Sequence, residues 1–434
     1  MKKVLLISYN FPPVGGAGVQ RPVKFVKYLR QFGWEPVVLT VSNPSVPIFD
    51  AGLLNDIPSG VTVYGARTLE PSYAQKQSFI AIGHNWKSKA KLTLKKVLAQ
   101  IMLPDLQILW WPDLIFKLVK VIRDERPSIL FVSAPPFSSF LPVVFIGRMF
   151  GVPVILDYRD EWQFSRNQWE NAIKHTLAKR LDLIIEGYVV RRCAALTAAN
   201  ESYVSSIYRT YPSVNPKKGF VVTNGYDEDD FKLIDNRCLA PHGKKTITFI
   251  YTGTVWKATS LKNIITALKK LLKMDQSLRE ILRIKIFGRI VDSELECFLD
   301  SDLEGVVQTH GYIAHADLMT ETMAADILLL TLSDLPGAEK IITGKAFEYM
   351  ASGKHILAIV PEGETKDLLT ENYNKLSLAG ANDVEEIYGA LVDIVANIES
   401  VRDANGKDVS HFSRRLLTSK LADIFNSVVY ANEK

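Results

Sequence analysis

The sequence has few cysteines and no histidine pattern typical of a metal centre. Its three cysteines, Cys193, Cys238 and Cys297, are far apart in 434 residues. An odd number of scattered cysteines argues against a disulfide framework and favours a reducing compartment. The histidines, including His310 and His315, lack the spacing of metal ligands. We therefore expect no metal site.

The sequence also has no long apolar run. No stretch approaches the roughly 18 apolar residues that a membrane helix needs. The apolar start at 4–8 breaks at Asn10-Phe11-Pro12-Pro13, which is too short for a signal peptide. With 47% hydrophobic and 23% charged residues, the composition is that of a globular protein. We predict a cytoplasmic protein, with a net charge of +5 that matters only where it is clustered.

A third glycine is missing from the first turn. The strand at 4–8 leads into a loop with Gly15 and Gly16, and a helix is predicted from about Gln20 to Phe32. A dinucleotide fingerprint would need glycine at position 21, which is Arg21. The loop is either a plain tight turn or bare backbone that a ligand approaches. We favour the second, because ligands of open α/β sheets bind at the carboxyl ends of strands.

Short apolar runs recur along the chain and predict two parallel sheets. A chain of this length also favours two domains. The predicted strands lie at 4–8, 35–41, 128–133, 154–157, 194–198, 219–223, 247–251, 283–288, 306–311, 327–330 and 355–360. We predict an α/β protein with two doubly wound, Rossmann-like domains that face each other across a cleft. They span 1–235 and 236–412, joined by a linker near 235–246, and a helix at 413–434 crosses back to the first domain.

Polar side chains follow the strand at 154–157. Tyr158, Arg159 and Asp160 come directly after it and precede Glu161 and Trp162. Arg159 beside two acids is also consistent with a structural ion-pair network. Their position at the carboxyl end of a strand favours contact with a second substrate, an acceptor.

The stretch 343–354 predicts a helix that feeds a buried strand. Thr343 is a candidate N-cap, and Gly353 lies where a helix usually ends. Gly344 and Lys345 open the helix, which creates an anion site at its N-terminus. Glu348, one turn further in, has a carboxylate that can accept two hydrogen bonds from a diol. Phosphate and diol together indicate a nucleotide.

A lysine-rich stretch lies between the second and third predicted strands. It contains Trp86 and five lysines without an acid, namely Lys87, Lys89, Lys91, Lys95 and Lys96. Such a stretch beside tryptophans is predicted to contact an anionic membrane surface at the inner face of the cell membrane. A solvated helix face is the equally weighted alternative.

Taken together, these motifs resemble the family-4 glycosyltransferases of the GT-B fold over nearly the whole chain. Matching pieces include Gly15-Gly16, Asn224-Gly225, Gly253 with Lys262, His310-Gly311, and Lys345-x-x-Glu348-Tyr349-Met350-Ala351-Ser352-Gly353. The resemblance implies transfer of a sugar from a nucleotide-diphosphate-sugar, with retention of configuration and without a cofactor or essential metal. The acceptor would be a glycan or lipid-linked molecule used in cell-surface polysaccharide synthesis.

The resemblance also implies roles for single residues. Glu348 matches the glutamate that binds the ribose, and Lys262 matches the lysine that neutralises the diphosphate, helped by Lys345. Gly15, Gly16, Gly253, Thr254 and Gly344 complete the donor side, whereas Tyr158, Arg159 and Asp160 form the acceptor side. Lys262 and Asp160 are the candidate catalytic residues. The signature's first glutamate is expected at position 340, which is Lys340, with Glu339 next to it.

Two alternative functions remain open at the level of sequence. One is a nucleotide-sugar epimerase with the same fold, which needs no acceptor. The other is a non-catalytic nucleotide-binding protein, which Lys340 and Thr254 make credible because they replace residues that the family usually has.

Overall fold

The computed structural model describes residues 1–80, 102–162, 176–232, 246–403 and 406–432. The lysine-rich stretch with Trp86, Lys87, Lys89, Lys91, Lys95 and Lys96 lies outside these residues, and so does most of the predicted linker. Within the described ranges, no helix has the length and apolar character needed to cross a membrane. The chain forms two compact units. Unit 1 comprises Met1–Asn224 and Arg414–Lys434, and unit 2 comprises Gly225–Ser413.

Unit 1 contains a parallel sheet of seven strands in the order β3-β2-β1-β4-β5-β6-β7. The strands are β1 (Lys2–Ser8), β2 (Trp34–Val41), β3 (Thr62–Ala66), β4 (Ile129–Ala134), β5 (Val154–Tyr158), β6 (Ala195–Ala198) and β7 (Gly219–Val221). The main helices are α1 (Ala17–Leu29), α2 (Tyr73–Ile80), α4 (Trp111–Glu125), α5 (Phe140–Met149), α7 (Thr176–Arg192), α8 (Glu201–Thr210) and α18 (Arg414–Asn432).

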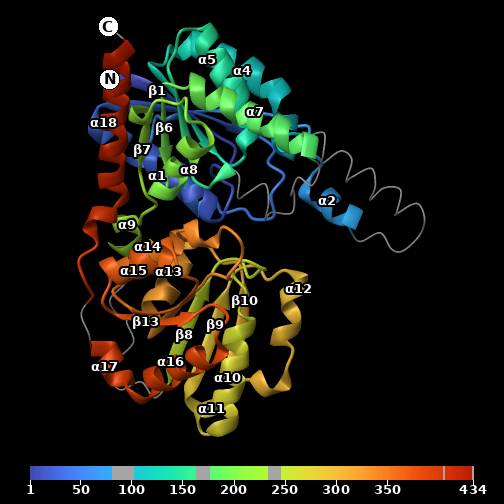
Figure 1. Cartoon of the computed structure of the whole chain (residues 1–434), viewed down its shortest axis with the longest axis vertical. Coiled ribbons are helices and arrows are strands. Elements are labelled where there is room, and N and C mark those ends of the chain that lie inside the picture. The colour runs from blue at the N-terminus through green and yellow to red at the C-terminus, as the bar shows by residue number, and fades with distance from the viewer. Residues whose placement is uncertain (81–101, 163–175, 233–245, 404–405, 433–434) are drawn as a thin grey trace. The chain divides into compact units, whose positions relative to one another are not determined.

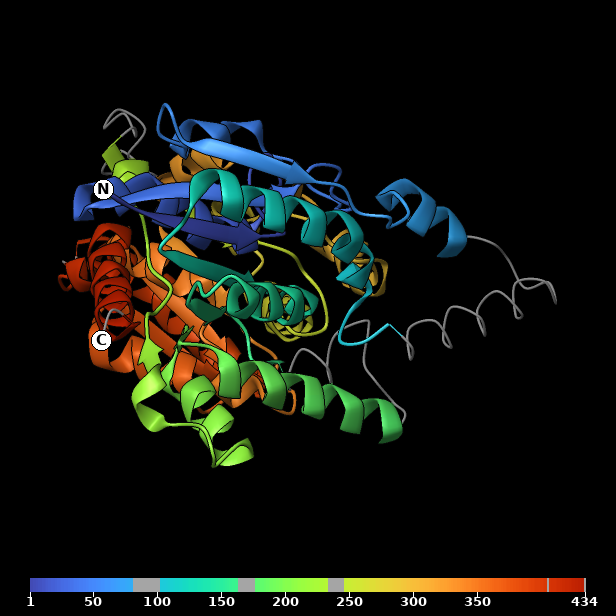
Figure 2. The ribbon, with the colours of Figure 1, turned by 90° about the horizontal axis from the view of Figure 1, so that it is seen from above.

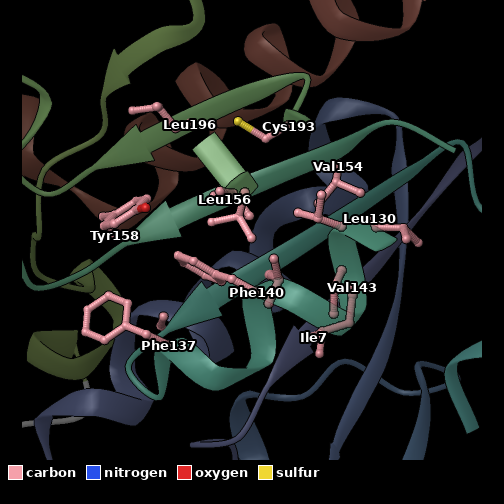
Figure 3. Packing of buried hydrophobic residues seen from close by; sticks show 14 of the residues in the cluster. Ile7, Leu130, Phe137, Phe140, Val143, Val154, Leu156, Tyr158, Cys193 and Leu196 are labelled. Atoms are coloured by element: carbon pink, nitrogen blue, oxygen red, sulfur yellow. The ribbon is translucent and has the colours of Figure 1, made fainter. Parts of the chain in front are cut away.

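Both faces of this sheet are covered at its centre, so the central strands β1, β4 and β5 are apolar on both sides. In β1, Leu5 and Ile7 point into a core shared with α4, α5 and α7, whereas Val4 and Leu6 point into a core shared with α1 and α18. Figure 1 shows α18 running beside the sheet, and Figure 2 shows α4, α5 and α7 in one row. Phe140 and Val143 of α5 pack on Leu130 and Leu156 in the first of these cores (Figure 3). Successive residues of a strand thus point into opposite cores, and this explains why the apolar runs are continuous.

Unit 2 repeats this plan with a parallel sheet of six strands in the order β10-β9-β8-β11-β12-β13. The strands are β8 (Ile247–Thr252), β9 (Leu282–Phe287), β10 (Val307–Gly311), β11 (Ile327–Thr331), β12 (His355–Val360) and β13 (Leu376–Gly380). The helices are α9 (Glu228–Lys232), α10 (Lys262–Met274), α11 (Leu278–Ile281), α12 (Asp292–Leu295), α13 (His315–Ala324), α14 (Gly344–Ala351), α15 (Glu364–Asn372), α16 (Val384–Ala396) and α17 (Ile398–Asp403).

The two faces of the second sheet also have separate cores. Phe249 and Tyr251 of β8 face the core that contains residues of α10 and α16. Ile250 faces the core that contains Phe347 and Met350 of α14. The predicted α/β class with two parallel, doubly wound sheets is confirmed. Each unit is thus a Rossmann-like layer structure with helices on both faces.

Candidate functional site

Each sheet has one point at which the strand order reverses. In unit 1, β1 lies between β2 and β4, and in unit 2, β8 lies between β9 and β11. Helices leave the sheet in opposite directions at such a point, so the carboxyl ends of the strands border an opening where ligands of open α/β sheets bind. The predicted donor residues Gly253 and Thr254 directly follow β8.

The loop after β8 is held by its own backbone and that of the next loop. The amide of Gly253 donates to the Phe287 carbonyl at 2.8 Å, and the Val255 amide donates to the Arg289 carbonyl at 2.8 Å. Gly288 has a φ of +131°, and a Cβ atom there would overlap the Gly253 carbonyl. The Thr254 carbonyl accepts from the Tyr251 and Thr259 hydroxyls at 3.0 and 2.7 Å. The loop is therefore fixed before any ligand arrives.

Lys345 lies beside this loop. Its Nζ is 3.9 Å from the centroid of the Tyr251 ring, and a Cβ atom at Gly253 would lie 3.3 Å from the same nitrogen. The ring face holds the ammonium by a cation–π interaction without neutralising it. The structure thus brings together two predicted donor residues from strand end β8 and from helix α14, which are about 90 residues apart in the chain.

Helix α14 presents Lys345 and Glu348 on one side. The two residues are three positions apart, so their side chains are neighbours on the helix surface. Thr343 has the N-cap position and Gly344 is the first helical residue, but the Thr343 side chain makes no capping hydrogen bond. The backbone amides of the first turn are therefore not covered by that hydroxyl. Gly353 follows the helix with a φ of +69°, as expected at its end.

Lys262, the first residue of α10, makes a different set of contacts. Its Nζ lies 3.3 Å from the carboxylate of Glu294 and 3.2 Å from the Ser293 carbonyl. Ser260 donates to the same buried Glu294 carboxylate at 2.6 Å. The Lys262 side chain is half exposed. Glu294 therefore orients this ammonium group.

Lys262 also lines a pocket of about 140 Å³ in unit 2. Its lining includes Ser260, Asn263, Ser333 and the buried Thr331. The Thr331 hydroxyl has no hydrogen-bond partner among the described residues. A small polar pocket at a helix N-terminus and a strand end can accept a polar group of a ligand.

The segment before α14 has no acid at the position that the resemblance implies. Ala338–Lys340 forms a 3₁₀ turn in which Glu339 is exposed and Lys340 is half-buried. A Cβ atom at Gly363 would overlap the Glu339 main chain, so this turn is packed against the start of α15. A one-residue shift that brings Glu339 to position 340 would disturb this packing.

In unit 1, Arg159 has a structural set of partners. It donates to the carbonyls of Ala134, Pro135 and Gly18, and burial lowers its pKa. Gly16 precedes α1, and the Gly15 amide donates to the Ile48 carbonyl at 3.0 Å. Arg159 thereby ties the start of α1, next to the glycine loop, to the loop after β4.

Tyr158 and Asp160 lie in different surroundings. Tyr158 is 1% exposed and packs on Phe140, with ring centroids 5.1 Å apart. The structure thus places it in the core rather than at an open surface. Asp160 is half-buried. Burial raises its pKa, although the nearby Arg159 acts in the opposite direction. A carboxyl group in that state can exchange a proton closer to neutral pH.

A buried ion pair beside this region was missed in the sequence. Arg21 contacts the Asp157 carboxylate at 2.7 Å and donates to the Val222 carbonyl at 2.7 Å. Asp157 also accepts from the Ser133 and Thr197 hydroxyls, each at 2.8 Å. Burial alone would raise the pKa of Asp157, but Arg21 and the hydroxyls outweigh it and lower that pKa. The residue that breaks the glycine pattern therefore belongs to a network that links β4, β5 and β6 to the segment after β7.

Glu294 and Tyr251 were also missed. Glu294 is 32 positions from Lys262 and carries no motif. Tyr251, by contrast, gives a usable signal, because an aromatic residue is the last but one of an apolar strand and lies two positions before a glycine.

The sequence matches no family profile, and no curated protein is significantly similar to it in sequence. In structure it is similar to sucrose-phosphate synthase from Thermosynechococcus elongatus, with a TM-score of 0.61 and 11% identity over 99% of this chain and 97% of that chain. HepE from Anabaena, in complex with UDP and glucose, has a TM-score of 0.59 and 12% identity over the whole of both chains.

Epimerases are also among the similar structures. UDP-GlcNAc 2-epimerase from Methanocaldococcus jannaschii has a TM-score of 0.55 and 12% identity over 98% of this chain and 100% of that chain. At such identities the likeness establishes the fold alone. The chain therefore has the two-domain α/β fold of GT-B enzymes, a fold that serves both sugar transferases and sugar epimerases.

Proposed function

We propose that this protein is a glycosyltransferase that moves a sugar from a nucleotide-diphosphate-sugar to an acceptor. The observation that carries the proposal is the meeting of Gly253 and Lys345 at the carboxyl end of β8, with Glu348 one turn along α14. Bare backbone, an ammonium group and helix amides suit a diphosphate. The Glu348 carboxylate suits the ribose hydroxyls. HepE, a structure of the same fold, binds UDP.

The transfer breaks the bond between the anomeric carbon and the diphosphate oxygen, and the acceptor hydroxyl forms the new bond. Negative charge grows on the leaving diphosphate as the bond breaks. Lys345, held over Tyr251, and Lys262, oriented by Glu294, stabilise that charge. Because both ammonium groups are fixed beforehand, little reorganisation is needed in the transition state. No metal has to supply this charge, so the reaction is proposed to be metal-independent.

We assign the acceptor to unit 1. Asp160 is a carboxyl group there whose pKa burial raises, and it is proposed to receive or orient the acceptor proton. Arg159 positions the neighbouring loops through carbonyl contacts. The acceptor class is a glycan or a lipid-linked molecule, and the anomeric configuration is retained, as in the family that the motifs resemble.

An epimerase is the second candidate, because epimerases are among the structures of the same fold. An epimerase would convert or release the sugar without an acceptor. A third reading, nucleotide binding without turnover, rests on Lys340 in place of the expected glutamate.

The deciding experiment measures release of nucleoside diphosphate from a panel of nucleotide-sugars, with and without acceptors extracted from cells. Acceptor-dependent release that persists in EDTA supports the proposal. Sugar conversion without an acceptor would establish the epimerase, and binding of a nucleotide without turnover of any donor would establish the third reading. Loss of activity in EDTA would contradict the metal-independent mechanism.

Replacing Glu348 tests the ribose contact directly. A hydrogen bond to a charged group is worth about 1.5–3 kcal/mol, so Glu348→Ala, which removes the acceptor, should weaken nucleotide binding about 10- to 100-fold. Calorimetric titration with UDP and GDP measures the change. Glu304→Ala, at an exposed loop position of the same unit, is the control and should leave affinity unchanged. Equal affinity of the two variants would remove Glu348 from the site.

A further inference from the structure

Three neighbouring helices of unit 1 share an outer surface with unusual chemistry. Helix α5 packs against both α4 and α7, and Figure 2 shows the three helices in one row. We define the α4–α5–α7 face as the outward side of these helices. Their inward sides bury residues such as Leu114, Val143 and Val189 in the core of the unit.

Large apolar side chains lie on this face at helical spacing. In α7, Leu177, Leu181 and Ile184 are 59%, 45% and 65% exposed. In α5, Phe145 and Met149 are 56% and 62% exposed. The positions i, i+4 and i+7 follow one side of a helix, so each set forms a stripe that points away from the core.

Helix α4 adds Phe116, 65% exposed, and Ile115, 37% exposed. The three helices thus carry seven of the 19 large apolar side chains that are exposed in the described residues. Single exposed apolar residues are ordinary, but a concentration on adjacent elements marks a surface that binds something. The inward side of each helix already packs in the core of unit 1 without these side chains.

The same face is basic. Its exposed basic side chains are Lys120, Arg123, Arg148, Lys179, Arg180, Arg191 and Arg192. Both acids of α7, Asp182 and Glu186, are buried, and α5 contains no acid. Along these three helices, all of which the structure describes, Asp124 is the exposed acid.

We propose that the α4–α5–α7 face docks on an anionic phospholipid bilayer. Apolar side chains enter the boundary between headgroups and acyl chains, while lysine and arginine meet the phosphates around them. A protein partner fits less well, because charged residues are depleted at the centre of protein interfaces, whereas on this face basic side chains lie among the apolar ones. Arginine above a tyrosine, as in the 4.0 Å contact of Arg192 with the Tyr188 ring, suits a headgroup boundary. The inference is independent of the sugar chemistry and of the lysine-rich stretch at 86–98.

The apolar part is tested with Phe116→Ser, Phe145→Ser and Ile184→Ser combined in the intact chain. Sedimentation with vesicles of phosphatidylcholine and phosphatidylglycerol in equal parts measures binding. We expect the wild type to bind and the triple variant to bind at least about ten-fold more weakly. The control combines Met274→Ser and Leu299→Ser, which are 72% and 80% exposed on unit 2, and should bind like the wild type.

The basic part is tested with Lys120→Gln, Arg148→Gln and Arg180→Gln. A basic side chain near an anionic surface contributes about five-fold, the equivalent of about 1 kcal/mol, so the triple variant should lose about 100-fold. Lys217→Gln with Lys273→Gln, two exposed lysines off the face, is the matched control. Binding of the wild type should also fall at high salt and be weak on pure phosphatidylcholine.

Three outcomes would overturn the proposal. The first is no vesicle binding by the wild type at low ionic strength. The second is binding that both triple variants retain. The third is a dimer in analytical ultracentrifugation that the apolar triple variant abolishes while vesicle binding is unchanged, since this would make the face a contact between two copies of the chain. Circular dichroism confirms that each variant is folded, which is expected because every replaced side chain is exposed.

Discussion

At the scale of single residues, Gly288 explains why the candidate donor site is ready-made. Its φ of +131° and the close approach of the Gly253 carbonyl leave no room for a side chain. The main chain of the loop after β8 therefore packs directly on the main chain of the loop after β9. Gly253, which has no side chain, lies next to the Lys345 ammonium group. Glycine adopts such a positive φ without steric cost, so it suits a position where two backbones approach this closely.

Gly288→Ala should consequently destabilise the protein by about 2 kcal/mol or more and weaken nucleotide binding, because the Gly253 loop has to move. Chemical denaturation and calorimetric titration measure the two effects. Gly389→Ala is the matched control, since this glycine lies inside α16 with nothing within 4 Å of the added methyl. It should stabilise by about 0.5–1 kcal/mol. A Gly288→Ala protein as stable as wild type would show that the two loops adjust freely.

His355 makes stability depend on pH. Burial, helped by the nearby Lys375, lowers the pKa of His355 from its usual 6.5 to about 4. The unfolded chain therefore binds a proton between pH 6.5 and 4 that the folded chain does not. The stability linked to neutral His355 is complete above about pH 6.5 and is lost as the pH falls toward 4.

The His355→Gln variant should remove this part of the pH dependence, while keeping a hydrogen-bonding group near the Ser377 hydroxyl, 2.9 Å from the His355 Nε2. Urea denaturation at pH 4.5, 5.5 and 7 gives the slope. His310→Gln, an exposed position, is the comparison. A slope identical in wild type and His355→Gln would contradict the assignment.

Candidate site residues were singled out where chemistry depends on local pattern. Gly253, Lys345 and Glu348 lie in short motifs beside strand and helix ends, so spacing marked them as candidates, and the structure brings Gly253 and Lys345 together. Arg21 and Glu294 were not predictable, because their roles arise from partners that are distant in the chain, Asp157 and Lys262. Tyr158 was predicted on the acceptor side because it follows a predicted strand. The structure places its side chain in the core instead.

At the scale of elements, the buried central strands were predicted best from the sequence. The continuous apolar runs in the centres of both sheets predicted β1, β4, β8 and β12 within a few residues. Two strands were missed, β3 and β13, and both are edge strands. Their residues are largely exposed or half-buried. An edge strand covered on fewer sides can lack a continuous apolar signal, although the edge strands β7 and β10 were predicted at 219–223 and 306–311.

Helix α18 provides an element that packing rather than local pattern holds in place. Phe425 contacts the rings of Trp34 and Phe131, with centroids 5.3 and 5.5 Å apart, and it is fully buried. Phe425→Ala should cost about 3–5 kcal/mol of stability. Leu416→Ala, a residue of the same helix that is 47% exposed, should cost about 0.5 kcal/mol or less. Thermal unfolding of both variants provides the measurement, and similar midpoints would mean that α18 is loosely attached.

At the scale of the whole molecule, unit 2 is one continuous segment with its own two cores. A fragment of residues 225–413 should therefore fold cooperatively. Because Gly253, Lys262, Lys345 and Glu348 all belong to it, the fragment should bind the nucleotide within about ten-fold of the intact chain, or about 1.4 kcal/mol. Thermal shift with UDP and GDP tests this. A folded fragment without nucleotide affinity would show that unit 1 supplies essential contacts.

Unit 1, in contrast, is divided between the two ends of the chain, since α18 covers the sheet face beside α1. On a ribosome, all of Gly225–Ser413 is made between the first segment and α18. At about 5–20 residues per second this takes roughly 10 to 40 s. During that interval the apolar surface around Trp34 and Phe131 is not yet covered by α18. The second unit in the sequence can thus finish folding first, and the nascent first unit is the part that needs protection from aggregation.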